Sequence, residues 1–320
     1  MSGRSVLVTG ASGLIGRRLV SLLAEDPEGI ETVVAMDLRE LPEDQRLAGI
    51  RYETGDIRDP QLGKRFQTWS IDTVVHLAAI VTPGKGSTRE LEHSIDVLGT
   101  ENVLRGCLEA GIGQLVYTSS GAAYGYHADN PVPLTERDSL RGNPEFAYSD
   151  HKRLVEEMLA RARSEHPELR QLVFRPGTIL GERVANPITA MFERPVILGV
   201  RGSDIPFVIV WDEDVARCIA KGIRERGSGI YNLAGDGVIT LREMARRLGK
   251  PYLALPVVVL ETALGLARTL GLTQLGPEQV NFLRYRPVLS NDRLKSEFGF
   301  SPTYTSEECF ERYRRIRFGD

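Results

Sequence analysis

Short apolar runs alternate with longer amphipathic segments through the first 175 residues of the chain. Between the runs, apolar residues recur at helical spacing in 14–25, 88–110 and 145–165. Strand–helix alternation of this kind predicts a doubly wound, parallel α/β sheet with right-handed crossovers. The runs are rich in β-branched residues, as buried parallel strands are, and they lie at 5–9, 32–36, 50–54, 72–78, 114–119 and 171–175.

The alternation of strands and helices becomes less regular after residue 176, where proline and glycine become frequent. Helical spacing is still present near 212–224, 240–248 and 257–270. No repeat or long flexible linker separates the two parts of the chain. We therefore expect a sheet domain over 1–175 and a smaller lobe over 176–320, with some segments of the later part returning to the sheet.

A glycine-rich segment, GASGLIG (10–16), directly follows the first predicted strand and opens a helix. Its three glycines suit a tight turn, a close approach to a pyrophosphate and close helix–strand packing, in that order. A helix N-terminus also offers free N–H groups and a positive dipole end to phosphates. The segment predicts a dinucleotide-binding Rossmann domain over 1–175. We expect the lobe over 176–320 to provide most of the substrate-binding residues. The loop residues expected at the cofactor are Gly10, Ser12, Gly13, Leu14, Ile15 and Gly16.

An acidic residue, Asp37, ends the second predicted strand, 21 positions after Gly16. This spacing is close to the roughly 20 residues expected for the acid that binds the adenosine ribose. A carboxylate accepts hydrogen bonds from the ribose hydroxyls and repels a 2′-phosphate, so Asp37 favours NAD over NADP. Arg39 acts in the opposite direction, because a basic side chain there could pair with that phosphate.

The composition argues against several other classes of function. The net charge is −3, which gives no electrostatic reason for binding nucleic acid or an anionic membrane. The three cysteines are widely spaced and form neither a disulfide framework nor a zinc motif, so no metal is expected. The apolar stretch 252–272 is interrupted by Pro256, Glu261 and Arg268, which argues against a membrane span. A cytoplasmic protein that acts on a small molecule is the expectation.

Five motifs in order resemble the extended short-chain dehydrogenase/reductase family: TGASGLIG, GDIRD (55–59), HLAA (76–79), YTSSGAAYG (117–125) and YSDHK (148–152). The family includes UDP-galactose 4-epimerase, nucleotide-sugar dehydratases and 3β-hydroxysteroid dehydrogenases. FRPGTILG (174–181) and YNLAGDG (231–237) extend the resemblance over nearly the whole chain. The resemblance implies a catalytic triad of Ser120, Tyr148 and Lys152. It also implies cofactor contacts at Asp56, Ile57, Leu77, Ala78, Ala79, Tyr148 and Lys152.

The chemistry of the triad agrees with this assignment. Tyr148 and Lys152 are four residues apart, so on a helix they share one face. A free tyrosine titrates near 10, and we expect the lysine ammonium, together with a positive nicotinamide ring, to lower the pKa of Tyr148. Ser120 would hydrogen-bond the reacting oxygen while Tyr148 moves the proton. The histidines at 76, 93 and 151 are expected to lie on a buried strand or on helix surfaces, outside the mechanism.

The chain also departs from the family pattern. Asp96 stands where the family usually has an asparagine, and a carboxylate cannot donate a hydrogen bond as that amide does. Thr178 replaces the asparagine that sugar-nucleotide enzymes carry after the sixth strand. No arginine directly precedes the stretch 206–216, and Arg201 lies several residues too early. Two expected anchors for a nucleotide diphosphate are therefore missing.

Three functions remain open from the sequence. The favoured one is an NAD-dependent oxidoreductase that transfers hydride at a secondary alcohol or ketone, with a mainly apolar substrate indicated by the aliphatic segments 194–200 and 252–267. The first alternative is a nucleotide-sugar epimerase or dehydratase with tightly bound NAD. The second is a non-catalytic dinucleotide sensor, which the intact triad argues against. The helices near 88–110 and 145–165 resemble those that pair across a two-fold axis in the family, which predicts a homodimer.

Overall fold

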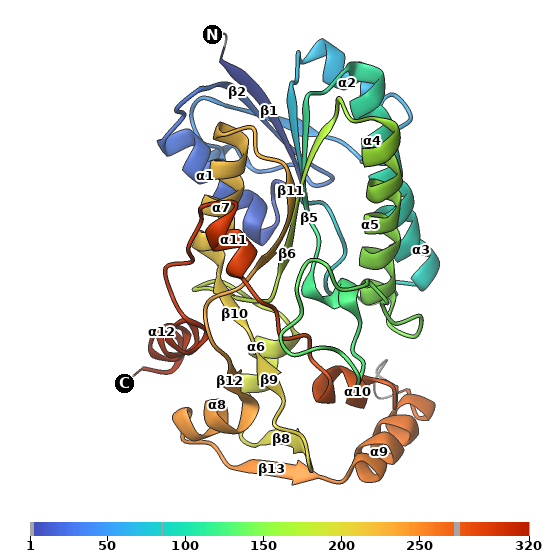
Figure 1. Ribbon diagram of the computed structural model, residues 1–320, viewed down its shortest axis with the longest axis vertical. Coiled ribbons are helices and arrows are strands. Elements are labelled where there is room, and N and C mark those ends of the chain that lie inside the picture. Colours follow the sequence, from blue (N-terminus) through green and yellow to red (C-terminus); the bar gives the residue numbers. More distant parts are fainter. Residues whose placement is uncertain (1–2, 85, 272–275, 320) are drawn as a thin grey trace.

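The computed structural model describes residues 3–84, 86–271 and 276–319, and shows a parallel sheet flanked by helices, with a smaller lobe below it (Figure 1). Within these ranges the main sheet has seven strands in the order β11-β6-β5-β4-β1-β2-β3, and every neighbouring pair is parallel. This arrangement confirms the predicted doubly wound Rossmann sheet. Its strands are β1 (Arg4–Thr9), β2 (Ile30–Asp37), β3 (Ile50–Thr54), β4 (Thr73–His76), β5 (Gln114–Thr118), β6 (Arg170–Pro176) and β11 (Gly229–Leu233).

Helices cover both faces of the sheet, and each face has its own apolar core. On one face, residues of α1 and α7 pack with the strands and with Leu294 of α11. On the other, residues of α2, α4 and α5 pack against the same strands (Figure 1). The flanking helices are α1 (Leu14–Glu25), α2 (Leu62–Thr68), α4 (Thr100–Ala110), α5 (Ala147–Glu165), α7 (Asp212–Arg224) and α11 (Asp292–Ser296).

The helix predicted over 88–110 is not uniform. It consists of α3 (Arg89–His93), a π-helical segment over Ser94–Gly99, and α4. A π-helical turn inserts an extra residue into the helix and often marks a functional site, because it redirects the side chains that follow. The turn here contains Asp96, the residue that departs from the family pattern.

The seventh strand, β11, was not predicted as a strand. It lies within the later part of the chain, pairs with β6, and places Tyr231 opposite Phe174. Helix α7 also packs against α1, far from it in sequence. Segments after residue 176 therefore complete the edge of the sheet, while the division of the chain at residues 175 and 176 stays a prediction.

The lobe has its own core, which includes Ile197, Val200, Phe310 and Tyr313. Ile197 and Val200 belong to the aliphatic segment 194–200, so that part of the expected substrate wall is the lobe's own interior. The lobe's strands are β7 (Thr178–Leu180), β8 (Ile197–Val200), β9 (Pro206–Phe207), β10 (Ile209–Trp211), β12 (Ile239–Thr240) and β13 (Tyr252–Leu255). Its helices are α6 (Pro187–Phe192), α8 (Leu241–Arg247), α9 (Val257–Thr269), α10 (Gln279–Arg284) and α12 (Ser306–Phe318).

Helix α9 lies at the far end of the lobe (Figure 1) and has no fully buried residue. Its valine at position 258 is 70% exposed. The end of the apolar stretch 252–272, residue 272, lies outside the described residues. Among the helices of the described ranges, none is long and apolar enough to cross a membrane.

Candidate active site

The glycine loop between β1 and α1 is packed so closely that two of its glycines, Gly10 and Gly16, leave no room for a side chain. Gly10 has φ +70°, and a Cβ there would lie 2.6 Å from the backbone nitrogen of Ala78. A Cβ on Gly16 would collide with the carbonyl oxygen of Gly10. Gly13 is the N-cap of α1 and offers no side chain to its first-turn N–H groups. These N–H groups lie at the positive end of the helix dipole and are free to bind the oxygens of a pyrophosphate.

Asp37 reaches this loop from the end of β2. One oxygen of its carboxylate accepts a hydrogen bond from the Ser12 N–H at 2.9 Å, and the other accepts from the Arg39 N–H at 3.1 Å. The carboxylate is thereby held beside the glycine loop, at the carboxyl edge of the sheet, where dinucleotides bind in this fold. Leu14 is 38% exposed and Ile15 is half-buried at the start of α1. These residues fit a bound dinucleotide.

Two further groups of expected cofactor residues lie along the same edge. Asp56 forms an ion pair with Arg58 at 2.6 Å, and the hydrogen bonds from Arg58 lower the pKa of Asp56. Ile57 is buried, and its carbonyl accepts a hydrogen bond from Asn102 of α4 at 2.7 Å. The remaining residues directly follow β4 and are half-buried: Leu77, Ala78 and Ala79.

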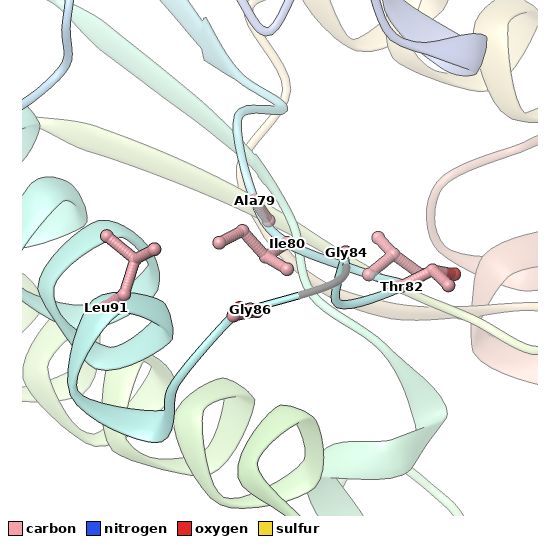
Figure 2. Close-up of a pocket in the computed structure, with 8 residues that line it drawn as sticks. Ala79, Ile80, Thr82, Gly84, Gly86 and Leu91 are labelled. Atoms are coloured by element: carbon pink, nitrogen blue, oxygen red, sulfur yellow. The ribbon is translucent and has the colours of Figure 1, made fainter. Parts of the chain in front are cut away.

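A cavity of about 410 Å³ opens next to Ala79. Its walls are the loop after β4 and the first turns of α3, and Figure 2 shows Ile80 and Leu91 facing each other across it. Gly84 and Gly86 lie on the loop between them. The cavity therefore lies beside the residues that follow β4, at the carboxyl edge of the sheet.

The structure brings the predicted triad together. Ser120 follows β5 and caps a short 3-10 turn, where its hydroxyl accepts from the Ala122 N–H at 3.1 Å. Tyr148 is in the first turn of α5, and Lys152 follows one turn later with its Nζ 5.8 Å from the Tyr148 ring centre. Lys152 Nζ donates to the Tyr117 hydroxyl at 3.0 Å and to the Thr118 carbonyl at 2.8 Å. One N–H of the ammonium is left for another acceptor.

Burial sets the proton affinities of this pair. It raises the pKa of Tyr148 to about 12, although a hydrogen bond with Ser120 acts in the opposite direction. Burial also lowers the pKa of Lys152 to about 8, against the opposing charges of Asp96 and Glu156. In the chain alone the pKa of Tyr148 is therefore raised rather than lowered, because desolvation of the phenolate is the largest effect. The expected lowering, which included a positive nicotinamide ring, stays a prediction for the cofactor-bound protein. A lower value requires positive charge from outside the chain.

His76 ends β4 and is buried between two threonines. Its Nδ1 lies 2.7 Å from the Thr9 hydroxyl and its Nε2 lies 2.9 Å from the Thr100 hydroxyl. Thr100 donates its own proton to the Asp96 carbonyl, so its oxygen must accept from Nε2–H, and Nδ1 accepts from Thr9. The ring is thus neutral, and burial, together with the charge of Lys152, lowers the pKa of His76 to about 3. Its role is to join β1 to α4 beneath the cofactor edge.

A buried ion pair beneath the triad was not predicted from the sequence. Arg175, on β6, donates to Glu156 of α5 through Nε and Nη2, with a shortest distance of 2.6 Å. Ser119 donates to the same carboxylate at 2.5 Å, and Arg175 also donates to Tyr124 at 2.8 Å. The network holds Ser119, the residue next to Ser120, against α5. The motif FRPG contained Arg175, but nothing in the sequence showed that it meets Glu156.

The lobe adds a second feature that the sequence did not reveal. Arg286 places its guanidinium 4.1 Å from the Phe207 ring centre and donates to the Thr178 hydroxyl at 2.9 Å. No carboxylate within the described ranges forms an ion pair with it, and burial lowers the pKa of Arg286. A cation therefore stands at the position where the family's asparagine is replaced by Thr178.

An aromatic cluster connects the lobe to the start of α5. Phe282 of α10 stacks on Phe146 with ring centres 4.4 Å apart and lies 5.1 Å from Tyr126. Phe146 in turn lies 6.1 Å from the ring of Tyr148. Aromatic rings thus border Tyr148 on the side toward the lobe.

Comparison with known proteins agrees with this fold. The NAD dependent epimerase/dehydratase family matches residues 6–234. An uncharacterized protein of Mycobacterium tuberculosis is 26% identical over 98% of this chain and 84% of its own. A UDP-glucose 4-epimerase of Halalkalibacterium halodurans is 33% identical over 48% of this chain and 45% of its own.

Solved structures show the same architecture. MoeE5 in complex with UDP-glucuronic acid and NAD is 23% identical, with a TM-score of 0.71 over 98% of both chains. The UDP-glucose 4-epimerase of Thermotoga maritima with UDP-glucose is 18% identical, with a TM-score of 0.74 over 97% of this chain and 98% of that one. At these identities the likeness concerns the fold.

Proposed function

The chain belongs to the NAD-dependent epimerase/dehydratase family, and from that premise we propose that it transfers hydride between NAD and a secondary alcohol or ketone carbon, with Tyr148 as the acid/base. The observation that supports this most directly is the placement of Ser120, Tyr148 and Lys152 at the end of β5 and on one face of α5. They lie on the same sheet edge as the glycine loop, so a dinucleotide in that loop would extend toward them.

Each residue of the triad has a distinct task in this proposal. Tyr148 holds a proton on its phenol at neutral pH, so it can supply one to a carbonyl oxygen or receive one from an alcohol. Ser120 hydrogen-bonds the same oxygen and orients it. Lys152 keeps its ammonium near the tyrosine ring, fixed by Tyr117 and the Thr118 carbonyl, with one N–H for a ribose hydroxyl. NAD, when bound, supplies the hydride acceptor and a positively charged ring.

For the cofactor we propose NAD rather than NADP. The carboxylate of Asp37 is oriented by two backbone N–H groups, and its remaining lone pairs suit ribose hydroxyls better than a 2′-phosphate. The neighbouring N–H groups at the start of α1 would hold the pyrophosphate.

The proposal is tested with Tyr148→Phe, which removes one oxygen and leaves the ring in place. We expect turnover to fall by about 10²-fold or more, the scale of a lost acid/base, while NAD affinity stays within about twofold. Activity is followed at 340 nm over a panel of hydroxyl and carbonyl compounds, and NAD affinity by calorimetry. Turnover within threefold of the parent would remove Tyr148 from the mechanism.

A second candidate, a nucleotide-sugar epimerase or dehydratase, is favoured by one observation. Arg286 is a cation without a carboxylate partner in the described ranges, beside Thr178 and over the ring of Phe207. A partly buried, unpaired guanidinium is stabilised by an anionic ligand group such as a phosphate. An apolar alcohol would leave this cation unpaired, so Arg286 weakens the expectation of a mainly apolar substrate.

Calorimetry with UDP on the NAD-loaded protein separates the two candidates. The nucleotide-sugar reaction would be supported if the parent binds UDP with low micromolar affinity and Arg286→Met binds it at least about tenfold more weakly. Arg284→Met is the matched control, because Arg284 is two residues away and stacks on Tyr285. No binding by the parent would favour a substrate without a nucleotide.

A further inference from the structure

Asp96 is a buried carboxylate that links the cavity wall to the catalytic helix. It is 6% exposed and lies in the π-helical segment Ser94–Gly99. Its Oδ1 accepts from the Ile80 N–H at 2.8 Å, on the loop that lines the cavity (Figure 2). Its Oδ2 lies 3.2 Å from Nδ1 of His151, the residue directly before Lys152. A single side chain thus joins three segments of the site.

The protonation of His151 follows from its contacts. Nδ1 must donate, because a carboxylate only accepts. The ring is 1% exposed, and Nε2 has no hydrogen-bond partner within the described ranges. A second proton on Nε2 would leave a buried N–H unsatisfied, which costs about 1–3 kcal/mol or more. His151 therefore donates from Nδ1 to the Asp96 carboxylate, which also accepts from the Ile80 N–H.

That charge acts on the reacting pair. Asp96 favours the ammonium form of Lys152 and the protonated form of Tyr148, in each case as a smaller effect than burial. Other titratable groups nearby include Glu156 of α5, whose charge also acts on Lys152, and Tyr117 on β5, which is influenced by Asp96. His93 on α3 has its ring 5.5 Å from that of His151. An asparagine at position 96 could keep the hydrogen bond to Ile80 but would carry no charge.

We propose that Asp96 and His151 form a buried positioning pair that holds the Ile80 loop against the catalytic helix and keeps a negative charge beside Lys152. The pair takes the place of the family's asparagine in this chain. The histidine fixes the orientation of the carboxylate, and the carboxylate helps Lys152 to stay protonated at neutral pH. The proposal rests on the proposed function only in taking Tyr148 and Lys152 as the reacting pair.

The titration of Lys152 tests the pair without substrate or cofactor. The chain has six lysines, so protein with ¹³C-labelled lysine gives few Cε–Hε signals, and Lys152→Arg identifies the signal of Lys152. The parent midpoint is expected near 8. In Asp96→Asn we expect it to fall by at least about half a pH unit, because one nearby opposite charge has been removed.

Two substitutions of His151 distinguish this role from simple packing. Asn places an amide N–H near the position of Nδ1, so His151→Asn should keep the parent midpoint. Leu removes the donor that fixes the orientation of the carboxylate beside Lys152, so the midpoint in His151→Leu should fall toward that of Asp96→Asn. A purely structural role would lower the melting temperature without moving the midpoint.

The proposal is overturned if the midpoint in Asp96→Asn matches that of the parent. If that variant does not fold, the two His151 variants decide: equal midpoints in His151→Leu, His151→Asn and the parent would overturn it as well. A failure of the proposed function is a separate result, since it is measured as the turnover of Tyr148→Phe. The titration result stands whichever substrate the protein uses.

Discussion

Acid should destabilise this protein through His76 before it protonates most carboxylates. The ring is 1% exposed and its pKa is lowered to about 3, whereas an unfolded histidine titrates near 6.5. Between these values the unfolded chain binds a proton that the folded chain does not, so stability is lost as the pH falls from 6.5 toward 3. One pKa unit is worth about 1.4 kcal/mol, which gives about 5 kcal/mol over the whole window. From pH 8 to pH 5 the loss is about 2 kcal/mol.

The comparison variant is His76→Gln, whose amide can accept from Thr9 and donate to Thr100 as the neutral ring does. It is expected to be less stable at every pH, because the ring that stacks on Tyr117 is gone. Its loss between pH 8 and pH 5 should nevertheless be about 2 kcal/mol smaller than that of the parent. Urea unfolding followed by tryptophan fluorescence gives both values. The control is His166→Gln, at an exposed histidine. Its free energy of unfolding should fall between pH 8 and pH 5 by as much as that of the parent.

An equal acid-induced loss in the parent and in His76→Gln would refute this reasoning. It would mean that the folded chain accepts a proton at His76 near its usual pKa. That result would also contradict the hydrogen-bond pattern, in which Thr9 donates to Nδ1 and leaves no acceptor for a second proton.

Three further outcomes are expected. Asp37→Ala should weaken NAD binding and narrow the preference over NADP, as measured by calorimetry, and a parent that prefers NADP would contradict the role given to Asp37. Glu156→Gln should lower the free energy of unfolding by about 3–5 kcal/mol in urea titrations, because it leaves the charge of Arg175 buried without its partner; a loss below 1 kcal/mol would contradict this. Light scattering should give about twice the 35.5 kDa of the chain, since exposed Leu91 and Leu98 on the 88–110 helices are available for a homodimer, and a value of 35.5 kDa would exclude one.

The sequence predicts the Rossmann sheet well because each buried strand carries its own signal. Six strands and the helices that separate them are read from local periodicity, and the helices at 14–25 and 212–224 have the predicted ends. The strand β11 was missed because its run is short and mixed, GIYNL, and its place is decided by pairing with β6. Tertiary pairing of this kind leaves no periodic pattern in the strand itself.

The site likewise contains residues that the sequence predicts and contacts that it does not. Gly10, Asp37, Ser120, Tyr148 and Lys152 are each marked by a motif of a few neighbouring residues. The contacts that tune them join residues far apart in the chain, such as the buried ion pair 19 positions apart and the Asp96–His151 pair 55 positions apart. Spacing along the chain cannot predict such pairs, because they depend on which elements become neighbours in the sheet.

The direction of the two proton affinities also depends on burial rather than on residue type. A lysine one turn from a tyrosine predicts a lower pKa for the tyrosine when both are in water. In the folded chain the phenol of Tyr148 and the ammonium of Lys152 have both lost water, and each is shifted toward its neutral form. In the chain alone Tyr148 therefore keeps its proton at neutral pH. The charges of Asp96 and Glu156 favour the ammonium form of Lys152. In the mechanism that we propose, both buried carboxylates favour the ammonium form of Lys152, so Asp96, a departure from the family pattern, would act on the same lysine as the proposed chemistry.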